Sequence, residues 1–235
     1  MTYIYEYIRT RGTQPLHFEE HYNRLEKLSR DLFLTTLPIS CEGLYKEIVK
    51  QLRAEGYSTT ATNAVCVKFY PLSKEVDISI EEIIYDSFAL RAIRPEGYIS
   101  PSSGEYITKK SSVRYALLEF NRSVAQISDA GVAIWATEEG EIIAIDGASA
   151  VAVFEDEIRF SNYGCDLEFE TAFEKLSATT NKVTRGSIYV EELHKAKELL
   201  GIDYRGVLAV ESFDSHIFMD ITAEKIATKM AETME

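Results

Sequence analysis

The pattern of hydrophobic and polar residues predicts a strand and two helices at the start of the chain. Residues 2–9 are rich in Tyr and Ile, which is typical of a strand. From Pro15 onward apolar residues recur at helical spacing, and a proline near a helix start loses no hydrogen bond. These apolar positions are Phe18, Leu25, Leu28 and Leu32. A second amphipathic helix is predicted over residues 42–54, with its end at Gly56.

Three strand-like runs follow these helices and complete a first domain. They cover residues 63–72, 75–85 and 88–94. Residues 1–97 are therefore expected to form an N-terminal α+β domain. Pro, Gly and Ser concentrate between residues 95 and 106, which indicates a connector, taken here as residues 98–107.

The remaining segment, residues 108–235, also mixes helices with strands. Apolar residues recur at helical spacing from Val113 to Ile127, which predicts a helix. Short strands are predicted within residues 131–162, then a helix over about 187–200, two more strands and a closing amphipathic helix from Ile221. The hairpin spacing of the strands disfavours a doubly wound parallel sheet. The expected fold class is α+β, with two mixed domains.

Composition and charge exclude several classes of function. The chain has 235 residues, of which 46% are hydrophobic and 27% are charged, so it can bury a core. Lys and Arg number 25 against 38 Asp and Glu, which gives a formal net charge of −13. This charge opposes binding to phosphate backbones, so no nucleic-acid partner is expected.

The cysteines and the start of the chain favour a cytoplasmic protein. Cys41, Cys66 and Cys165 are far apart and odd in number, and no CxxC spacing suggests a metal or redox pair. Reduced thiols are typical of the cytoplasm. The first residues lack the pattern of a signal peptide, and no apolar run approaches the roughly 18 residues of a membrane span. We expect no membrane contact.

The sequence HFEEH at residues 17–21 matches the H-x-x-E-H pattern of inverted zinc peptidases. On a helix, His17 and His21 would lie one turn apart and face a metal, with Glu20 as the base. Such a site also needs a carboxylate from a later helix, and the helices that follow contain no pattern that supplies one. The preferred interpretation is that His21 packs or hydrogen-bonds at a domain face, and that no metal is bound.

Two adjacent lysines, Lys109 and Lys110, stand directly before the predicted helix of the second domain. Adjacent lysines are usually a solvated pair. At the mouth of an interdomain cleft, however, a lysine can lose enough water for its neutral amine to become an imine-forming nucleophile. Arg114 and Tyr115 follow closely enough in the chain to share a site with Lys110.

The segment KVTRG at residues 182–186 precedes a helix-like stretch. A helix start with exposed amides and nearby cations such as Arg185 binds anions, although a simple N-cap is the alternative. The sequence contains no GxGxxG, no GxxxxGK[ST] and no G-x-S-x-G pattern, which disfavours Rossmann, P-loop and α/β-hydrolase chemistry.

In chain order, these segments resemble the class IV (fold type IV) pyridoxal-phosphate (PLP) enzymes, the family of branched-chain and D-amino-acid aminotransferases and aminodeoxychorismate lyases. The resemblance covers nearly the whole chain. HYNRL at residues 21–25 is similar to the family's H-x-x-R-L motif, which implies that Arg24 binds the cofactor phosphate. KSSVRY is similar to the segment of the family's Schiff-base lysine. This implies that Lys110 takes that role, with Lys109 as the fallback, and that Arg114 and Tyr115 belong to the site.

Three later segments are implied to complete the cofactor site. IDGASAVAVF stands where the family has E-G-x-x-x-N-I-F, so Asp146 replaces the glutamate that pairs with the pyridine nitrogen. KVTR resembles the phosphate loop G-I-T-R, which assigns the amides of Val183 and Thr184 to the phosphate, although Lys182 replaces the glycine. Ser212 matches a Thr or Ser found near the C-terminus of the family.

The resemblance implies an aminotransferase-like enzyme that uses pyridoxal 5'-phosphate and acts on a small amino acid and keto acid pair, with the cofactor cleft between the domains. An aminodeoxychorismate lyase, which releases 4-aminobenzoate, is the alternative. The second alternative is a homologue that has lost the chemistry and serves as a binding protein. It is motivated by Lys182, by the missing Asn and by Asp214 in the loop that would receive a substrate carboxylate.

The family also implies a homodimer. The chain contains 14 Tyr and 11 Phe, several of them in the first domain, and aromatic residues left on a surface tend to mark interfaces. The alternative is that they fill the core of that domain.

Overall fold

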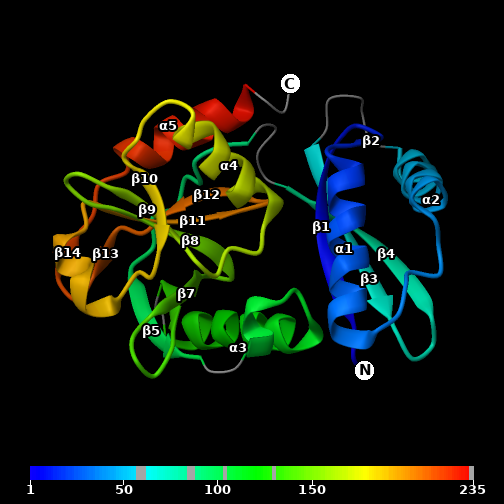
Figure 1. The fold of residues 1–235 in the computed structure, drawn as a ribbon, viewed down its shortest axis with the longest axis horizontal. Coiled ribbons are helices and arrows are strands. Elements are labelled where there is room, and N and C mark those ends of the chain that lie inside the picture. The colour runs from blue at the N-terminus through cyan, green and yellow to red at the C-terminus, as the bar shows by residue number, and fades with distance from the viewer. Residues whose placement is uncertain (57–61, 84–87, 103–104, 129–130, 233–235) are drawn as a thin grey trace. The chain divides into compact units, whose positions relative to one another are not determined.

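The computed structural model describes residues 1–56, 62–83, 88–102, 105–128 and 131–232, drawn in Figure 1. The chain divides into two compact units. Unit 1 comprises Met1–Ser87 and Lys109–Ser112, and unit 2 comprises Phe88–Thr108 and Val113–Glu235. Each unit mixes helices with its own sheet, so the expected α+β class is confirmed.

Unit 1 is an antiparallel sheet with two helices on one face. The strand order is β2-β1-β3-β4, and the strands are β1 (Ile4–Arg11), β2 (Gln14–Pro15), β3 (Thr62–Tyr70) and β4 (Glu75–Glu82). The helices are α1 (Phe18–Phe33) and α2 (Cys41–Ala54). Ile4 and Ile8 of β1 pack with Leu25 of α1 and Ile48 of α2 in one core, because alternate side chains of a strand share a face.

Unit 2 is built on a mixed sheet of eight strands. Its order is β10-β9-β8-β7-β6-β5, with β11 paired to β8 and to β12. The strands are β5 (Gly97–Pro101), β6 (Val132–Ala136), β7 (Ile142–Ile145), β8 (Ala148–Val153), β9 (Ile158–Ser161), β10 (Val183–Gly186), β11 (Glu198–Asp203) and β12 (Gly206–Ala209). The pairs β5–β6 and β9–β10 are parallel and the others antiparallel, so the sheet is not doubly wound.

Three helices and a hairpin complete unit 2. The helices are α3 (Ser112–Ser128), α4 (Leu167–Ser177) and α5 (Ile221–Ala231), joined by short 3-10 turns η1 (Glu105–Thr108) and η2 (Val190–Lys195). The hairpin is formed by β13 (Ser212–Phe213) and β14 (His216–Ile217). Helices α4 and α5 lie side by side and share a core with Val151 and Phe160 (Figure 1). Leu118 of α3 packs in a separate cluster that contains Trp135. Among the helices described, none is both long and apolar enough to span a membrane.

Two element predictions are wrong. The helix expected over residues 187–200 is replaced by η2 and by β11, which is buried between β8 and β12. Burial in the sheet outweighs the helical propensity of this segment. Residues 88–94 form no strand and make a single bridge, between Leu90 and Val207. Helix α4 is not among the predicted elements.

The two units differ from the predicted domains. Residues 98–107, expected to be a connector, contain most of β5, which pairs along its length with β6. The segment Lys109–Ser112 groups with unit 1 because its backbone pairs with β1. Local composition indicates turns but does not show which strand completes which sheet.

Candidate active site

Lys110 is held at the edge of the unit 1 sheet, immediately before α3. The amide of Tyr5 donates to the carbonyl of Lys110 at 3.0 Å, and the amide of Ser112 donates to the carbonyl of Tyr3 at 2.8 Å. Ile4 and Ser111 form an antiparallel bridge between these two bonds. The backbone around Lys110 is therefore fixed against the start of β1.

The Lys110 ammonium meets a carboxylate that is also bound by a histidine. Its Nζ donates to Oε1 of Glu6 at 2.7 Å, and Nδ1 of His21 lies 3.2 Å from the same oxygen. The three side chains are only 6%, 3% and 2% exposed, in the order Lys110, Glu6 and His21. Burial alone would raise the pKa of Glu6, but Lys110, His21 and Arg24 together lower it to about 2. Glu6 is thus a carboxylate at neutral pH and holds Lys110 as the ammonium.

Arg24 lies one turn after His21 on α1 and acts on the same carboxylate, because its charge contributes to the lowered pKa of Glu6. The structure therefore brings together Arg24 and Lys110, two of the residues predicted from the sequence, around a third that was not predicted. Whether Arg24 binds a phosphate stays a prediction.

The HFEEH segment is not arranged as a helical metal pair. His17 is the residue before α1 and has a left-handed backbone, with φ 47°, whereas His21 is buried and bonded to Glu6. Glu20 is exposed. In the part of the chain that the structure describes, no group of three or more His, Cys, Asp or Glu side chains could hold a metal ion.

Arg114 supports the turn that carries Asp146. Its guanidinium donates to the carbonyls of Ile107 and Gly147 and lies over the ring of Trp135, 5.2 Å from the centroid. The position of Gly147 favours glycine, because its φ is 75° and an added Cβ would lie 3.1 Å from the side chain of Leu118. Arg114 therefore has a structural role in unit 2, while the roles of Arg114 and Tyr115 toward a cofactor stay predictions.

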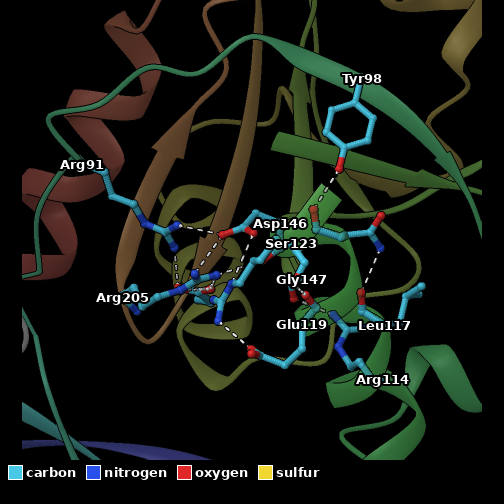
Figure 2. A network of polar contacts seen from close by, with 12 residues as sticks. Arg91, Tyr98, Arg114, Leu117, Glu119, Ser123, Asp146, Gly147 and Arg205 are labelled. Atoms are coloured by element: carbon cyan, nitrogen blue, oxygen red, sulfur yellow. Dashed lines mark hydrogen bonds and ion pairs between the residues drawn. The ribbon is translucent and has the colours of Figure 1, made fainter. Parts of the chain in front are cut away.

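Asp146 belongs to a network of aspartates and arginines, shown in Figure 2. Arg205 donates from Nη1 to Oδ2 of Asp146 at 2.8 Å and from Nη2 to its carbonyl at 2.9 Å. The same guanidinium bonds Asp203 from Nε at 2.9 Å and from Nη2 at 2.6 Å. Arg91 donates to the other oxygen of Asp203 at 2.5 Å, and Arg122 Nε lies 3.7 Å from Oδ1 of Asp146.

The aspartates and arginines of this network keep one another in their charged forms. Burial would raise the pKa of Asp203, but Arg205 and Arg91 hold it well below its ordinary value. Burial would likewise lower the pKa of Arg205, but Asp203 and Asp146 raise it. A pyridinium N–H approaching Asp146 would have to compete with Arg205 for the carboxylate.

The segment KVTRG is a strand, β10, and not the start of a helix. The next helical element, η2, has six residues, so the helix start on which the predicted anion site depended does not form. Thr184 donates its hydroxyl to Glu157 at 2.5 Å. Of the expected cations, Lys182 pairs with Asp156 at 3.6 Å, and Arg185 pairs with Glu170 and lies over Phe173. The amides of Val183 and Thr184 keep their predicted phosphate role as a hypothesis.

Ser212 lies in the hairpin β13–β14, where it pairs with Ile217. The turn of this hairpin contains Asp214 and Ser215, with φ 47° and 66°. The role of Ser212 toward a cofactor stays a prediction.

The predicted site residues are thus shared between the units. Arg24 and Lys110 lie in unit 1; Arg114, Tyr115, Asp146, Val183, Thr184 and Ser212 lie in unit 2. Sequence reasoning missed Glu6 and Arg205. Glu6 stands between Ile4 and Ile8 on the inward face of β1, so the period-two pattern of this strand contained a signal for a buried carboxylate.

Comparisons with known proteins identify the fold. No protein-family model matches the sequence, and no curated protein does. Solved structures match over almost the whole chain. The branched-chain aminotransferase of the archaeon Thermoproteus uzoniensis, solved with norvaline, has a TM-score of 0.83 at 16% identity and covers 97% of this chain and 84% of its own.

Two further structures agree. The T.th. branched-chain amino acid aminotransferase, complexed with N-(5'-phosphopyridoxyl)-L-glutamate, has a TM-score of 0.81 at 17% identity and covers 99% of this chain and 85% of its own. A Legionella pneumophila protein provisionally assigned as a 4-amino-4-deoxychorismate lyase has a TM-score of 0.80 at 14% identity. It covers 99% of this chain and 91% of its own. The chain therefore has the fold of the fold type IV PLP enzymes.

Proposed function

We propose that the protein is a PLP-dependent, aminotransferase-like enzyme that acts on a small amino acid and keto acid pair. The observation that carries this proposal is Lys110, a buried lysine placed directly before α3 in a chain with a fold type IV architecture. The phosphopyridoxyl ligand of the T.th. aminotransferase structure supports the choice of pyridoxal 5'-phosphate as the cofactor.

The charges of unit 1 fit an anionic cofactor. Lys110 and Arg24 both act on the carboxylate of Glu6, so the cluster contains two positively charged side chains, a composition that suits a phosphate group. In this proposal Arg24 would hold the phosphate group of the cofactor and Lys110 would be the residue that holds its aldehyde group. The bound cofactor would supply an electron sink for charge that develops on the substrate's α-carbon.

Lys110 would also move the proton. As a neutral amine free of the aldehyde group, Nζ of Lys110 would be the base that takes and returns the proton at the substrate's α-carbon, and Tyr115 belongs to the same proposed site. Transamination and aminodeoxychorismate cleavage share this proton transfer and differ in the group that leaves.

The residues of unit 2 fit less well. Asp146 is bonded by Arg205, and Thr184 is bonded by Glu157, so each would have to exchange a present bond for one to the cofactor. We therefore assign no step to Asp146, Val183, Thr184, Arg114 or Ser212, which stay proposed contacts.

The experiments described below also test two alternative functions. An aminodeoxychorismate lyase is supported by the Legionella pneumophila match. A binding protein without chemistry is favoured by the Asp146–Arg205 pair and by the tight hold of Glu6 on Lys110.

The first experiment is an absorption spectrum of the purified protein with added PLP. The proposal expects a visible band that Lys110→Ala abolishes and Lys109→Ala, the matched control, retains. A wild-type protein without a band, or a band retained in both variants, contradicts it.

Amino donors tested with keto acids, beside an assay for 4-aminobenzoate, then separate the two reactions. Cofactor binding with no half-reaction would support the binding protein.

We further propose a homodimer that uses α3. Val113, Phe120 and Ile127 are 53%, 64% and 87% exposed and stand seven residues apart, so they share one face of the helix. An exposed apolar stripe of this kind fits a second copy of the chain. Light scattering at low micromolar concentration tests this, because a mass near 26.6 kDa would contradict it.

A cytoplasmic location is also proposed, since Cys41, Cys66 and Cys165 form no disulfide. Fractionation of the source cells tests it, and recovery outside the cytoplasm would refute it.

A further inference from the structure

The turn between β7 and β8 gives a structural reason for an aspartate at residue 146. Strand β7 ends at Ile145 and β8 begins at Ala148, and these two residues pair, so Asp146 and Gly147 form the turn. Their φ angles are 48° and 75°, both in the left-handed region. A two-residue hairpin turn of this kind favours Asp followed by Gly, whereas Glu is not among the residues enriched in this region. The aspartate at this position is therefore explained without a ligand.

Arg205 holds this turn through two parts of Asp146 (Figure 2). Nη1 of Arg205 donates to Oδ2 of the Asp146 carboxylate at 2.8 Å, and Nη2 donates to the Asp146 carbonyl at 2.9 Å. Asp203 of β11, whose side chain is only 4% exposed, bonds the same guanidinium at Nε and Nη2. Arg205 therefore fixes the backbone of the turn as well as the carboxylate, and Asp203 fixes Arg205.

Other guanidinium groups surround the same turn. Nη1 of Arg91 lies 3.9 Å from Oδ2 of Asp146, and Nε of Arg122 lies 3.7 Å from Oδ1. Arg114 donates to the carbonyl of Gly147 at 2.6 Å. Both carboxylate oxygens of Asp146 therefore face arginine side chains. A pyridinium at this carboxylate would be a further cation among cations, and like charges nearby favour the loss of its proton.

We infer that Asp146 belongs to the β7–β8 turn and is held there by Arg205, and that it does not pair with the pyridine nitrogen of PLP, which stays unprotonated in the bound cofactor. This role deepens the proposed function and rests on it, because only a bound cofactor offers Asp146 another partner. It removes Asp146 from the proposed contacts of the cofactor. The ring then lacks the acidic partner that the resemblance implies at this position.

Urea unfolding of the cofactor-free protein, followed by Trp135 fluorescence, tests the structural role. Asp146→Asn should lower the midpoint, and the same substitution in an Arg205→Met background should lower it less, because the bonds between the two side chains are already lost. Asp146→Glu keeps the charge but should also lower the midpoint, since Glu fits the left-handed backbone poorly. Equal shifts in both backgrounds, or an unchanged midpoint in Asp146→Glu, would overturn the inference.

A second measurement uses only the wild-type protein. Nitrogen-15 NMR is recorded at neutral pH on the protein loaded with PLP that is labelled at the pyridine nitrogen, after free cofactor is removed. Free labelled PLP in acid and in alkali gives the reference positions of the protonated and unprotonated ring. We expect the unprotonated position, and a pyridinium resonance would overturn the inference.

The two measurements separate this inference from the proposed function. A protein that binds no PLP refutes the proposed function, whereas the urea experiments, which omit PLP, still decide whether Asp146 and Arg205 hold the turn. A protein that binds PLP and shows a pyridinium resonance keeps the proposed function and loses the inference.

Discussion

Acid should weaken unit 1 through Glu6. Folding lowers the pKa of this carboxyl from 4.5 to about 2, because Lys110, His21 and Arg24 outweigh its burial. At about 1.36 kcal/mol for each pKa unit, the charged carboxylate contributes about 3 kcal/mol to the free energy of unfolding. Since the folded pKa is the lower one, this contribution is complete above the unfolded value and is lost as the pH falls from about 5 toward 2.

Hydrogen exchange of peptides from β1 and β3 measures this loss locally. Between pH 5 and pH 3 the opening free energy of these strands should fall by about 2 kcal/mol through Glu6. Glu6→Gln should lack that part of the fall, while Glu42→Gln, which removes a carboxylate that is 78% exposed, should keep it. An equal fall in the wild type and in Glu6→Gln would refute the reasoning.

Four further predictions concern unit 2. Arg205→Met leaves two aspartates without their shared guanidinium and should cost about 3–5 kcal/mol, measured by urea unfolding with Trp135 fluorescence; an unchanged midpoint would contradict it. Gly147→Ala should cost roughly 1–2 kcal/mol in the same assay, because its φ is 75°; equal stability would show that the turn tolerates a Cβ. Glu198→Gln should lower the opening free energy of α5 by about 1 kcal/mol, since the carboxylate accepts hydrogen bonds from the first amides of this helix; unchanged amide hydrogen exchange in α5 would refute this. Phe120→Asp should convert the proposed dimer to a monomer in light scattering, and a dimer that persists would exclude α3 from the interface.

Elements with a strong local pattern were predictable from the sequence. Helices α1 and α2 each bury a stripe of apolar residues, α3 follows the helical spacing of apolar residues although Val113, Phe120 and Ile127 stay exposed, and β6 to β9 alternate with polar turns. Strand β11 was not predictable, because the run KAKELL has the composition of a helix. Its strand form depends on burial between β8 and β12, where Gly201 approaches Ala148 so closely that an added Cβ would lie 3.0 Å from it.

The candidate site was predictable where it rests on short motifs. Lys110 and Arg24 follow from KSSVRY and HYNRL, and the structure places them around one carboxylate. That Glu6 supplies this carboxylate depends on the pairing of residues 109–112 with β1, a contact between segments about a hundred residues apart. The engagement of Asp146 by Arg205 likewise requires the fold, because 59 residues separate them in the sequence.

The central claim is that Lys110 is the cofactor lysine, and covalent trapping tests it most directly. Purified protein is incubated with PLP, reduced with borohydride and digested, and the phosphopyridoxyl-modified peptides are mapped by mass spectrometry. Our account predicts one dominant adduct, on Lys110, that is lost in Lys110→Ala and retained in Lys109→Ala. No specific adduct, or an adduct on another lysine while Lys110 stays unmodified, would contradict it.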